Sequence, residues 1–277
     1  MSEERCVATV KEITQYWSWR TKARVLFDSA RLYLISHTRW IDRTSGWIRF
    51  PFYHHIFSDE QAGFCKQLEY MRNYGEFISL DSAVRLLHTG ERIDGRYFCI
   101  TFDDGIGACY DYAFPILADK GVPAAFFIVP EYVSSGADRD HRSCRPLPGL
   151  KMKVNYMTWD ECMEMKNGGM AIGSHTYSHS RLSQLSDADA YGELRRSKEI
   201  IEKNLGGRCD HFACPWGMPG IDYIPEKHVL MAKEIGYKSF LTVQRGVTTQ
   251  GDSPFAIRRD FLYANSAPYI LRYFFGT

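Results

Sequence analysis

The chain has 277 residues, of which 45% are hydrophobic, 24% charged and 14% aromatic. This composition is typical of globular proteins and excludes disordered and fibrous classes. The formal net charge is only +1, so the chain lacks the strong positive field with which proteins attract nucleic acids. We therefore expect no nucleic-acid partner.

Residues 1–45 form the first predicted unit. The stretch "WSWRTKARVLFDSARLYLISHTRW" interleaves basic residues with aromatic and aliphatic ones at roughly helical spacing. It could rest as an amphipathic helix on the inner face of a membrane, which would make the protein peripherally membrane-associated. It could also pack on the main domain, which we favour because acidic residues interrupt the polar face. We expect a helical extension over residues 1–45 and one domain over residues 46–277.

The N-terminus and the cysteines indicate the cellular compartment of the protein. The first residues contain no apolar core of a secretion signal, and no stretch has the apolar length of a membrane span. Eight cysteines are scattered without a CxxC pair or a framework spacing, so we interpret all of them as reduced thiols. These features predict a cytoplasmic protein.

From Trp47 onward, β-prone runs alternate with helix-like segments. This alternation indicates parallel strands joined by helices, and hence a doubly wound sheet or a barrel. The segment Ser134–Lys151, rich in Gly, Pro and charge, is predicted to be a long surface loop. The β-prone runs are WIRFPFYHHI, YFCITF, PAAFFIVP, MAIGSH, HFACPWG, KSFLTV and FAIRRDFL. The predicted helices are Ser58–Tyr74, Leu80–His88, Tyr110–Lys120, Thr158–Lys166, Asp187–Leu205 and Pro225–Ile235.

The run "YFCITF" ends at two neighbouring carboxylates, Asp103 and Asp104, followed by Gly105. In parallel α/β folds the loops at the carboxyl ends of the strands converge, and active sites lie there. Two adjacent carboxylates in a confined site repel each other unless a cation or a hydrogen-bond donor neutralises them. The pattern therefore predicts a positive group nearby, although "DDG" alone is also typical of an ordinary turn.

Two further runs end in polar or turn residues. His175 and His179, four residues apart, can reach one metal ion from a compact loop. One carboxylate with two imidazoles leaves coordination positions open for water and substrate, as in catalytic metal sites. Pro215, Trp216 and Gly217 could form a tight turn that presents backbone N–H groups and an aromatic wall, or simply a buried turn.

The segments "TFDDG" (101–105), "HTYSH" (175–179) and "FACPWG" (212–217) resemble, in this order and spacing, the first three motifs of the polysaccharide deacetylase family. This family is also called the NodB-homology family, or carbohydrate esterase family 4. The resemblance covers residue 48 to the end. It implies a distorted (β/α)7 barrel, a single divalent metal ion and removal of an acetyl group from an acetylated amino sugar.

The resemblance also implies roles for individual residues. Asp103 would be the general base, and Asp104, His175 and His179 would bind the metal. Zn²⁺ is the first expectation, with Co²⁺, Mn²⁺ or Ni²⁺ as alternatives. The oxyanion would be held by the metal and by a backbone N–H of the third motif, that of Trp216, next to Pro215.

The sequence departs from the family pattern at two places. Ala213 and Cys214 stand where the third motif carries an arginine and its first proline, so Arg258 or Arg259 is the candidate partner for the base. The C-terminal segment, residues 260–277, contains no histidine that could protonate the leaving amine. His54 or His55, after the first predicted strand, is the candidate general acid, with His211 less favoured.

These residues predict a metal-dependent hydrolase that removes an N-acetyl or other small acyl group from an amino sugar. The absence of a secretion signal favours a cytoplasmic nucleotide- or lipid-linked precursor of a surface polysaccharide as its substrate. Two alternatives are open. The protein could bind acylated sugars without catalysis, or it could remove a formyl group from a lipid-linked amino sugar.

Overall fold

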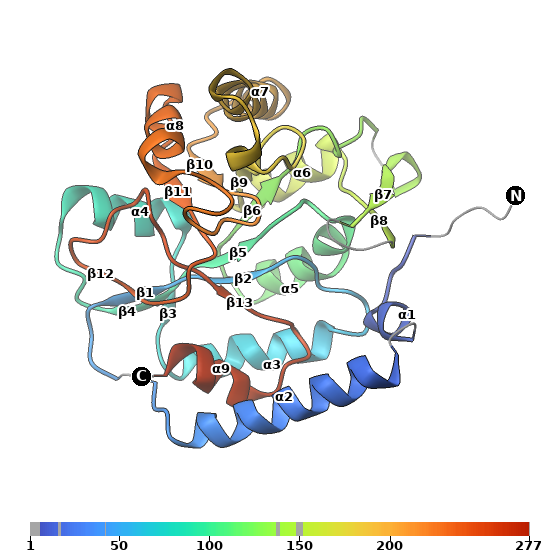
Figure 1. The fold of residues 1–277 in the computed structure, drawn as a ribbon, viewed down its shortest axis with the longest axis vertical. Coiled ribbons are helices and arrows are strands. Elements are labelled where there is room, and N and C mark those ends of the chain that lie inside the picture. The colour runs from blue at the N-terminus through green and yellow to red at the C-terminus, as the bar shows by residue number, and fades with distance from the viewer. Residues whose placement is uncertain (1–5, 16–17, 42, 137–138, 148–151, 277) are drawn as a thin grey trace, which may run out of the picture.

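A computed structural model describes residues 6–15, 18–41, 43–136, 139–147 and 152–276 (Figure 1). Its centre is a seven-stranded sheet in the order β11-β10-β9-β6-β5-β2-β13, in which every neighbouring pair is parallel. The strands are mostly continuous apolar runs because helices cover a parallel sheet. They are β2 (Pro51–Tyr53), β5 (Ile100–Phe102), β6 (Ala124–Ile128), β9 (Ala171–Ser174), β10 (His211–Ala213), β11 (Ser239–Leu241) and β13 (Asp260–Phe261).

Residues 257–261 close this sheet into a barrel. On one side, the N–H of Ile257 donates to the Phe240 carbonyl of β11 at 3.1 Å. On the other side, the N–H of Asp260 donates to the Phe50 carbonyl beside β2 at 3.0 Å. Because the closing strand is so short, the barrel is irregular. The predicted distorted (β/α)7 barrel is confirmed.

A smaller sheet extends two of the barrel strands. It has the order β12-β1-β4-β3 and lies at the amino-terminal ends of β2 and β5. Only Phe50 separates β1 from β2, and only Cys99 separates β4 from β5. The predicted runs WIRFPFYHHI and YFCITF therefore each contribute one strand to each sheet. The strands are β1 (Trp47–Arg49), β3 (Glu76–Phe77), β4 (Arg96–Phe98) and β12 (Thr248–Thr249).

The helices of the barrel lie where the sequence predicts them. Thr158 forms a capping box with Glu161, and the Ser186 hydroxyl accepts from the N–H of Asp189, so both helices begin with side-chain caps. π-helical turns, Cys109–Ala113 and Pro225–Val229, lead into α5 and α8. The helices are α3 (Gln61–Arg72), α4 (Leu80–Thr89), α5 (Phe114–Asp119), α6 (Trp159–Asn167), α7 (Asp187–Leu205) and α8 (Leu230–Ile235).

The N-terminal residues contain two helices, α1 (Val10–Thr14) and α2 (Trp19–His37), and the division into an extension and a domain stays a prediction. The structure adds α9 (Pro268–Phe275), which the sequence did not predict, and α2 packs beside it (Figure 1). The rings of Tyr33 and Tyr269 meet edge to face at 5.2 Å between centroids. No helix among the described residues combines the length and apolarity of a membrane span. The exact boundary after residue 45 stays a prediction.

The segment Ser134–Lys151 is not the simple loop that we predicted. It contains a 3₁₀ turn, Arg139–His141, and the strand β7 (Cys144–Pro146), which pairs antiparallel with β8 (Lys153–Asn155). Residues 137–138 and 148–151 of this segment lie outside the described part of the chain. Gly, Pro and charge therefore marked a hairpin whose first strand is exposed, not a segment without strands.

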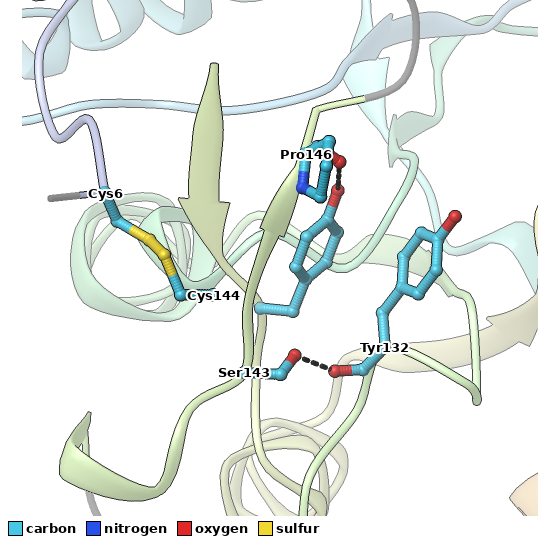
Figure 2. The surroundings of a disulfide bond; sticks show 6 residues. Cys6, Tyr132, Ser143, Cys144 and Pro146 are labelled. Atoms are coloured by element: carbon cyan, nitrogen blue, oxygen red, sulfur yellow. Dashed lines mark hydrogen bonds between the residues drawn. A yellow bond between two sulfur atoms is a disulfide. The ribbon is translucent and has the colours of Figure 1, made fainter. Parts of the chain in front are cut away.

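A disulfide joins Cys6 to Cys144 of this hairpin, with the two Cα atoms 6.3 Å apart (Figure 2). The N–H of Val7 donates to the Lys153 carbonyl at 2.9 Å, which holds the N-terminal segment against the hairpin. The expectation that all cysteines are reduced is therefore wrong for this pair. Spacing could not reveal it, since 138 residues separate the partners.

A thiol count tests this disulfide. Without reductant, the denatured protein should react at six thiols, and after reduction at all eight. The Cys6→Ser variant should give seven thiols in both states, because Cys144 is then free. A count of eight before reduction would contradict the pairing. Disulfides persist in oxidising compartments, so the count on freshly isolated protein also tests the cytoplasmic location, which stays a prediction.

Candidate active site

Four non-glycine residues have left-handed backbone among the described residues, and all four belong to the three sequence motifs. They are Asp104 (φ 72°), Thr176 (φ 58°), His179 (φ 61°) and Trp216 (φ 62°). This conformation costs side-chain-bearing residues free energy and persists only where the surrounding structure imposes it. Its concentration after β5, β9 and β10 indicates that the strand ends are shaped for a purpose other than stability.

β5 delivers two carboxylates to the mouth of the barrel. The strand ends at Phe102, and the N–H of Asp103 still donates to the Tyr53 carbonyl of β2 at 2.9 Å. The chain then turns away through Asp104 and Gly105, the latter with φ 77°. The two carboxylates thus leave the same strand end in different directions.

Asp104, His175 and His179 point at one another. The Nε2 atoms of His175 and His179 lie 3.4 and 3.2 Å from Oδ1 of Asp104, and all three side chains are at most 7% exposed. The ligand atoms of the three residues lie within 4.8 Å of one another. The Asp104 oxygen has no hydrogen-bond partner within the described part of the chain. A single cation could therefore bind all three atoms.

The protonation of these groups fits a divalent metal ion. Nδ1 of His175 lies 2.8 Å from the Ala213 carbonyl, which can only accept, so Nδ1 carries the proton and Nε2 presents a lone pair. Burial opposes ionisation of Asp104, yet the two imidazoles in their protonated form outweigh it and hold its pKa well below the ordinary value. A cation between the three groups would stabilise the same negative charge and leave each Nε2 free to bind it. An anionic oxygen and imidazole nitrogens are ligands that Zn²⁺ and similar ions prefer.

Arg259 on the closing strand holds Asp103. Its two terminal nitrogens donate to Oδ1 and Oδ2 of Asp103, each at 2.7 Å, and its Nε donates to the Thr242 carbonyl at 2.9 Å. The guanidinium also lies over the ring of Phe52, 4.3 Å from its centroid. Burial opposes ionisation of Asp103, but Arg259 and two nearby imidazoles together outweigh it and keep the pKa below its ordinary value. Asp103 is thus an ionised, oriented carboxylate beside the three candidate ligands.

Of the two candidate arginines, the geometry brings only Arg259 to the site. Arg258 is exposed, and its guanidinium donates to the Val247 carbonyl at 3.4 Å. The difference follows from strand alternation, since neighbouring side chains point to opposite faces of the sheet. An arginine from the last strand is therefore the partner of Asp103 in this chain, which has Ala213 in the third motif.

The third motif forms a tight turn. The N–H of Gly217 donates to the Pro215 carbonyl at 2.6 Å around Trp216, the pattern of a γ-turn. The indole of Trp216 is 41% exposed and lies 5.6 Å from the His179 ring. The backbone N–H of Trp216 has no acceptor among the described residues. Of the two interpretations left open by the sequence, the structure favours a turn that presents an aromatic wall and a free donor.

The three candidate histidines have different surroundings. His54 lies against Phe261, with ring centroids 5.0 Å apart, and water exclusion lowers its pKa in spite of the attraction of Asp104 and Asp103. His55 instead places Nδ1 2.8 Å from Glu60.

His211 begins β10, at the far end of the strand from the third motif. Its ring lies between Asp81, 3.1 Å away, and Ser239, 2.9 Å away. Therefore only His54 and His55 reach the site.

These groups line one cavity of 510 Å³ at the mouth of the barrel. The two aspartates and the four histidines, 54, 55, 175 and 179, form its polar part. The remaining lining residues are apolar or aromatic: Phe52, Leu147, Trp216, Val243, Phe261 and Tyr263. A cavity with a few charged groups in an apolar wall is typical of small-ligand sites.

Sequence reasoning missed most of that wall. Phe261 ends the closing strand and Tyr263 follows two residues later, so this spacing could have placed them on one face. Leu147 lies in the segment predicted as a surface loop over one rim of the fold, and the sequence did not single it out as a lining residue. Val243 follows β11, and no sequence feature marks it as a lining residue.

Comparison with known proteins identifies the family to which the chain belongs. The chain is 22% identical to the poly-beta-1,6-N-acetyl-D-glucosamine N-deacetylase of Staphylococcus aureus, over 78% of this chain and 71% of that protein. It shares its fold with IcaB of Ammonifex degensii, with a TM-score of 0.69 at 22% identity, covering 83% of this chain and 97% of that one.

The deacetylase PplD of Streptococcus pyogenes, solved in complex with acetate, has the same fold, with a TM-score of 0.66 at 23% identity. That match covers 84% of this chain and 99% of PplD. The family model described as polysaccharide deacetylase matches residues 91–240, which is 150 of the 277 residues and includes all three motifs. The chain belongs to the polysaccharide deacetylase family.

Proposed function

We propose that the protein is a metal-dependent deacetylase that removes the N-acetyl group from an amino sugar. One observation carries this proposal: Asp104, His175 and His179 converge on one point, directly beside a carboxylate that Arg259 keeps ionised. A purely structural metal site needs no such free carboxylate. A protein that only binds sugars would not need one either.

Asp104, His175 and His179 would hold the metal, with Zn²⁺ first and Co²⁺, Mn²⁺ or Ni²⁺ as alternatives. When bound, the ion supplies Lewis acidity toward the amide carbonyl and lowers the pKa of water. Asp103, fixed by two hydrogen bonds from Arg259, accepts the proton of the attacking water. The free N–H of Trp216, beside Pro215, donates to the carbonyl oxygen as negative charge develops there.

His54 is the proposed general acid. It lies beside the two aspartates, and its lowered pKa leaves the imidazole neutral in the resting cavity. It can then take up the proton that Asp103 has accepted from water and pass it to the nitrogen of the departing amine as the C–N bond breaks. His55 is already bonded to Glu60, so a supporting role fits it better.

Single substitutions of the two histidines separate these roles. His54→Gln should lower kcat by about 10² to 10⁴-fold, the usual contribution of a general acid. His55→Gln should lower it by less than about tenfold, because its ring is bonded away from the reacting atoms. Both variants should bind metal as the unaltered protein does. Unchanged turnover in His54→Gln would show that His54 is not the general acid. A larger loss in His55→Gln than in His54→Gln would assign that role to His55.

The substrate is proposed at the level of class. The name of the Staphylococcus aureus relative makes β-1,6-linked N-acetylglucosamine oligomers the first substrates to test. Nucleotide- and lipid-linked N-acetylated sugars are the second group, as expected for a cytoplasmic precursor. N-formyl analogues form the third group.

Release of free amine and of the acid from this panel, with zinc-loaded and with chelator-treated protein, tests the proposal. We expect release only with metal, from at least one acetylated substrate. Preference for the formyl analogue would identify a deformylase instead. Binding of an acetylated oligomer without any release, with metal present, would indicate the non-catalytic alternative.

A further inference from the structure

The outer face of α2 carries large apolar side chains that nothing in the described structure covers. Trp19, Phe27 and Leu34 are 74%, 70% and 70% exposed. They are eight and seven residues apart, which places them on one side of the helix. The opposite side packs on α9, where Ser36 is fully buried. The exposed residues therefore form a stripe along the helix, which we call the α2 stripe.

Positive charge borders the α2 stripe. Helix α2 contains four Lys or Arg residues and one acidic residue, Asp28, in a chain whose total net charge is +1. Arg24 and Arg31 are three residues before and four after Phe27, so they neighbour it on the helix surface. Arg20 lies against the ring of Trp19, at 5.6 Å. Arg24 is 3.8 Å from Asp28, so the single acid is paired with one of these arginines.

Apolar residues exposed singly are normal on a soluble protein, whereas three large ones aligned on one helix face indicate an interaction site. Apolar side chains bordered by arginines match a lipid surface with anionic headgroups, because the side chains enter the acyl boundary while the guanidinium groups meet phosphates. A second protein chain would not require the positive border. No described helix could span a bilayer, so contact would be with its surface.

We propose that α2 binds the surface of an anionic lipid bilayer through the α2 stripe and Arg20, Arg24 and Arg31. The unpartnered side of the helix is then the membrane side, and the barrel stands away from the lipid. This use of α2 is independent of the hydrolytic function.

The position of α1 sets the orientation of the site on the membrane. Backbone N–H groups of Val10 and Lys11 donate to the Asp59 carboxylate at 3.0 and 3.2 Å, in the loop after β2. The N-terminal end of α2 therefore lies near the mouth of the barrel, and the helix runs along its side next to α9 (Figure 1). With α2 flat on a bilayer, the cavity opens along the membrane plane.

Flotation of the full chain with vesicles tests this proposal. We expect the protein to float with vesicles of phosphatidylcholine and phosphatidylglycerol and much less with pure phosphatidylcholine vesicles. Replacing the α2 stripe by serine, Trp19→Ser/Phe27→Ser/Leu34→Ser, should lower the apparent partition coefficient by about tenfold or more. Arg20→Gln/Arg24→Gln/Arg31→Gln should lower it by about tenfold on anionic vesicles and remove the preference for them.

A matched control changes exposed apolar residues elsewhere. Ile221 and Leu230 are 64% and 61% exposed, and Leu230 begins α8, on the far side of the barrel from α2 (Figure 1). Ile221→Ser/Leu230→Ser should float like the unaltered chain. Because all substituted side chains are exposed, the thermal unfolding midpoint should change little in every variant.

Three results would overturn the proposal. The first is no flotation of the unaltered chain with anionic vesicles. The second is equal loss of flotation in the Ile221/Leu230 control. The third is a concentration-dependent dimer that the stripe variant dissociates, because the face would then belong to a second copy of the chain. None of these results depends on whether the protein hydrolyses a sugar, so failure here is distinguishable from failure of the proposed function.

Discussion

Asp103→Asn should lower kcat by about 10³-fold, within the range that a general base contributes, and leave metal binding intact. The amide cannot accept the proton of the attacking water, whereas the three candidate ligands are unchanged. The variant also leaves the guanidinium of Arg259 buried without a counter-charge. Breaking a buried pair in this way costs about 3 to 5 kcal/mol of unfolding free energy. Activity must therefore be measured on folded protein, with metal content measured in parallel.

Asp111→Asn is a control for the stability effect. Asp111 also receives two hydrogen bonds from one arginine, Arg142, at 2.7 and 2.9 Å, and both side chains are nearly buried. It does not line the 510 Å³ cavity. This variant should lose stability but keep its turnover per folded molecule. Turnover in Asp103→Asn close to that of the unaltered protein would rule out Asp103 as the base.

His175→Ala should lose both the metal and the activity. Removing the imidazole leaves two candidate ligands, and the Ala213 carbonyl loses its donor. Zinc that binds only the folded protein should stabilise the unaltered chain by about 2.7 kcal/mol at one hundred times its Kd. That stabilisation should be absent in the variant. Metal analysis after dialysis, and unfolding with and without zinc, measure the effect without any substrate.

His211→Ala is the matched control for the loss of a buried imidazole. His211 is 4% exposed and bonded to Asp81 and Ser239 at the other end of β10. This variant should keep the zinc-dependent stabilisation even if it is less stable overall. A His175→Ala protein that binds zinc as tightly as the control would show that His175 is not a ligand.

The barrel was predictable because its strands are unusually clear. Runs such as "PAAFFIVP" and "YFCITF" are apolar on both faces, and helices with recognisable caps separate them. What escaped prediction are elements without such a pattern: the hairpin of β7 and β8, helix α9, and the disulfide of Cys6. Their positions follow from tertiary contacts between segments far apart in the chain, which local patterns do not record.

The candidate site was likewise predictable in part. Asp103, Asp104, His175 and His179 stand at the ends of predicted strands, so parallel topology alone brings them to one edge. His54 and His55 both line the cavity and differ in their surroundings. Choosing between Arg258 and Arg259 required knowing which side chain faces inward. That is a matter of register, and a shift of one residue reverses it. The sequence narrowed the arginine to two neighbours, and the histidine to two neighbours with His211 less favoured. The coordinates distinguish the arginines, and the general acid stays a proposal.

The position of the closing strand near the end of the chain determines when the site is completed during synthesis. Residues 257–261 complete the hydrogen-bonding circuit of the barrel and also carry Arg259. A growing polypeptide that has emerged only as far as β11 already contains all three candidate metal ligands and Asp103, but that aspartate has no guanidinium to orient it. If Asp103 acts as the base that we propose, hydrolysis would therefore begin only after the last strand of the nascent chain has docked.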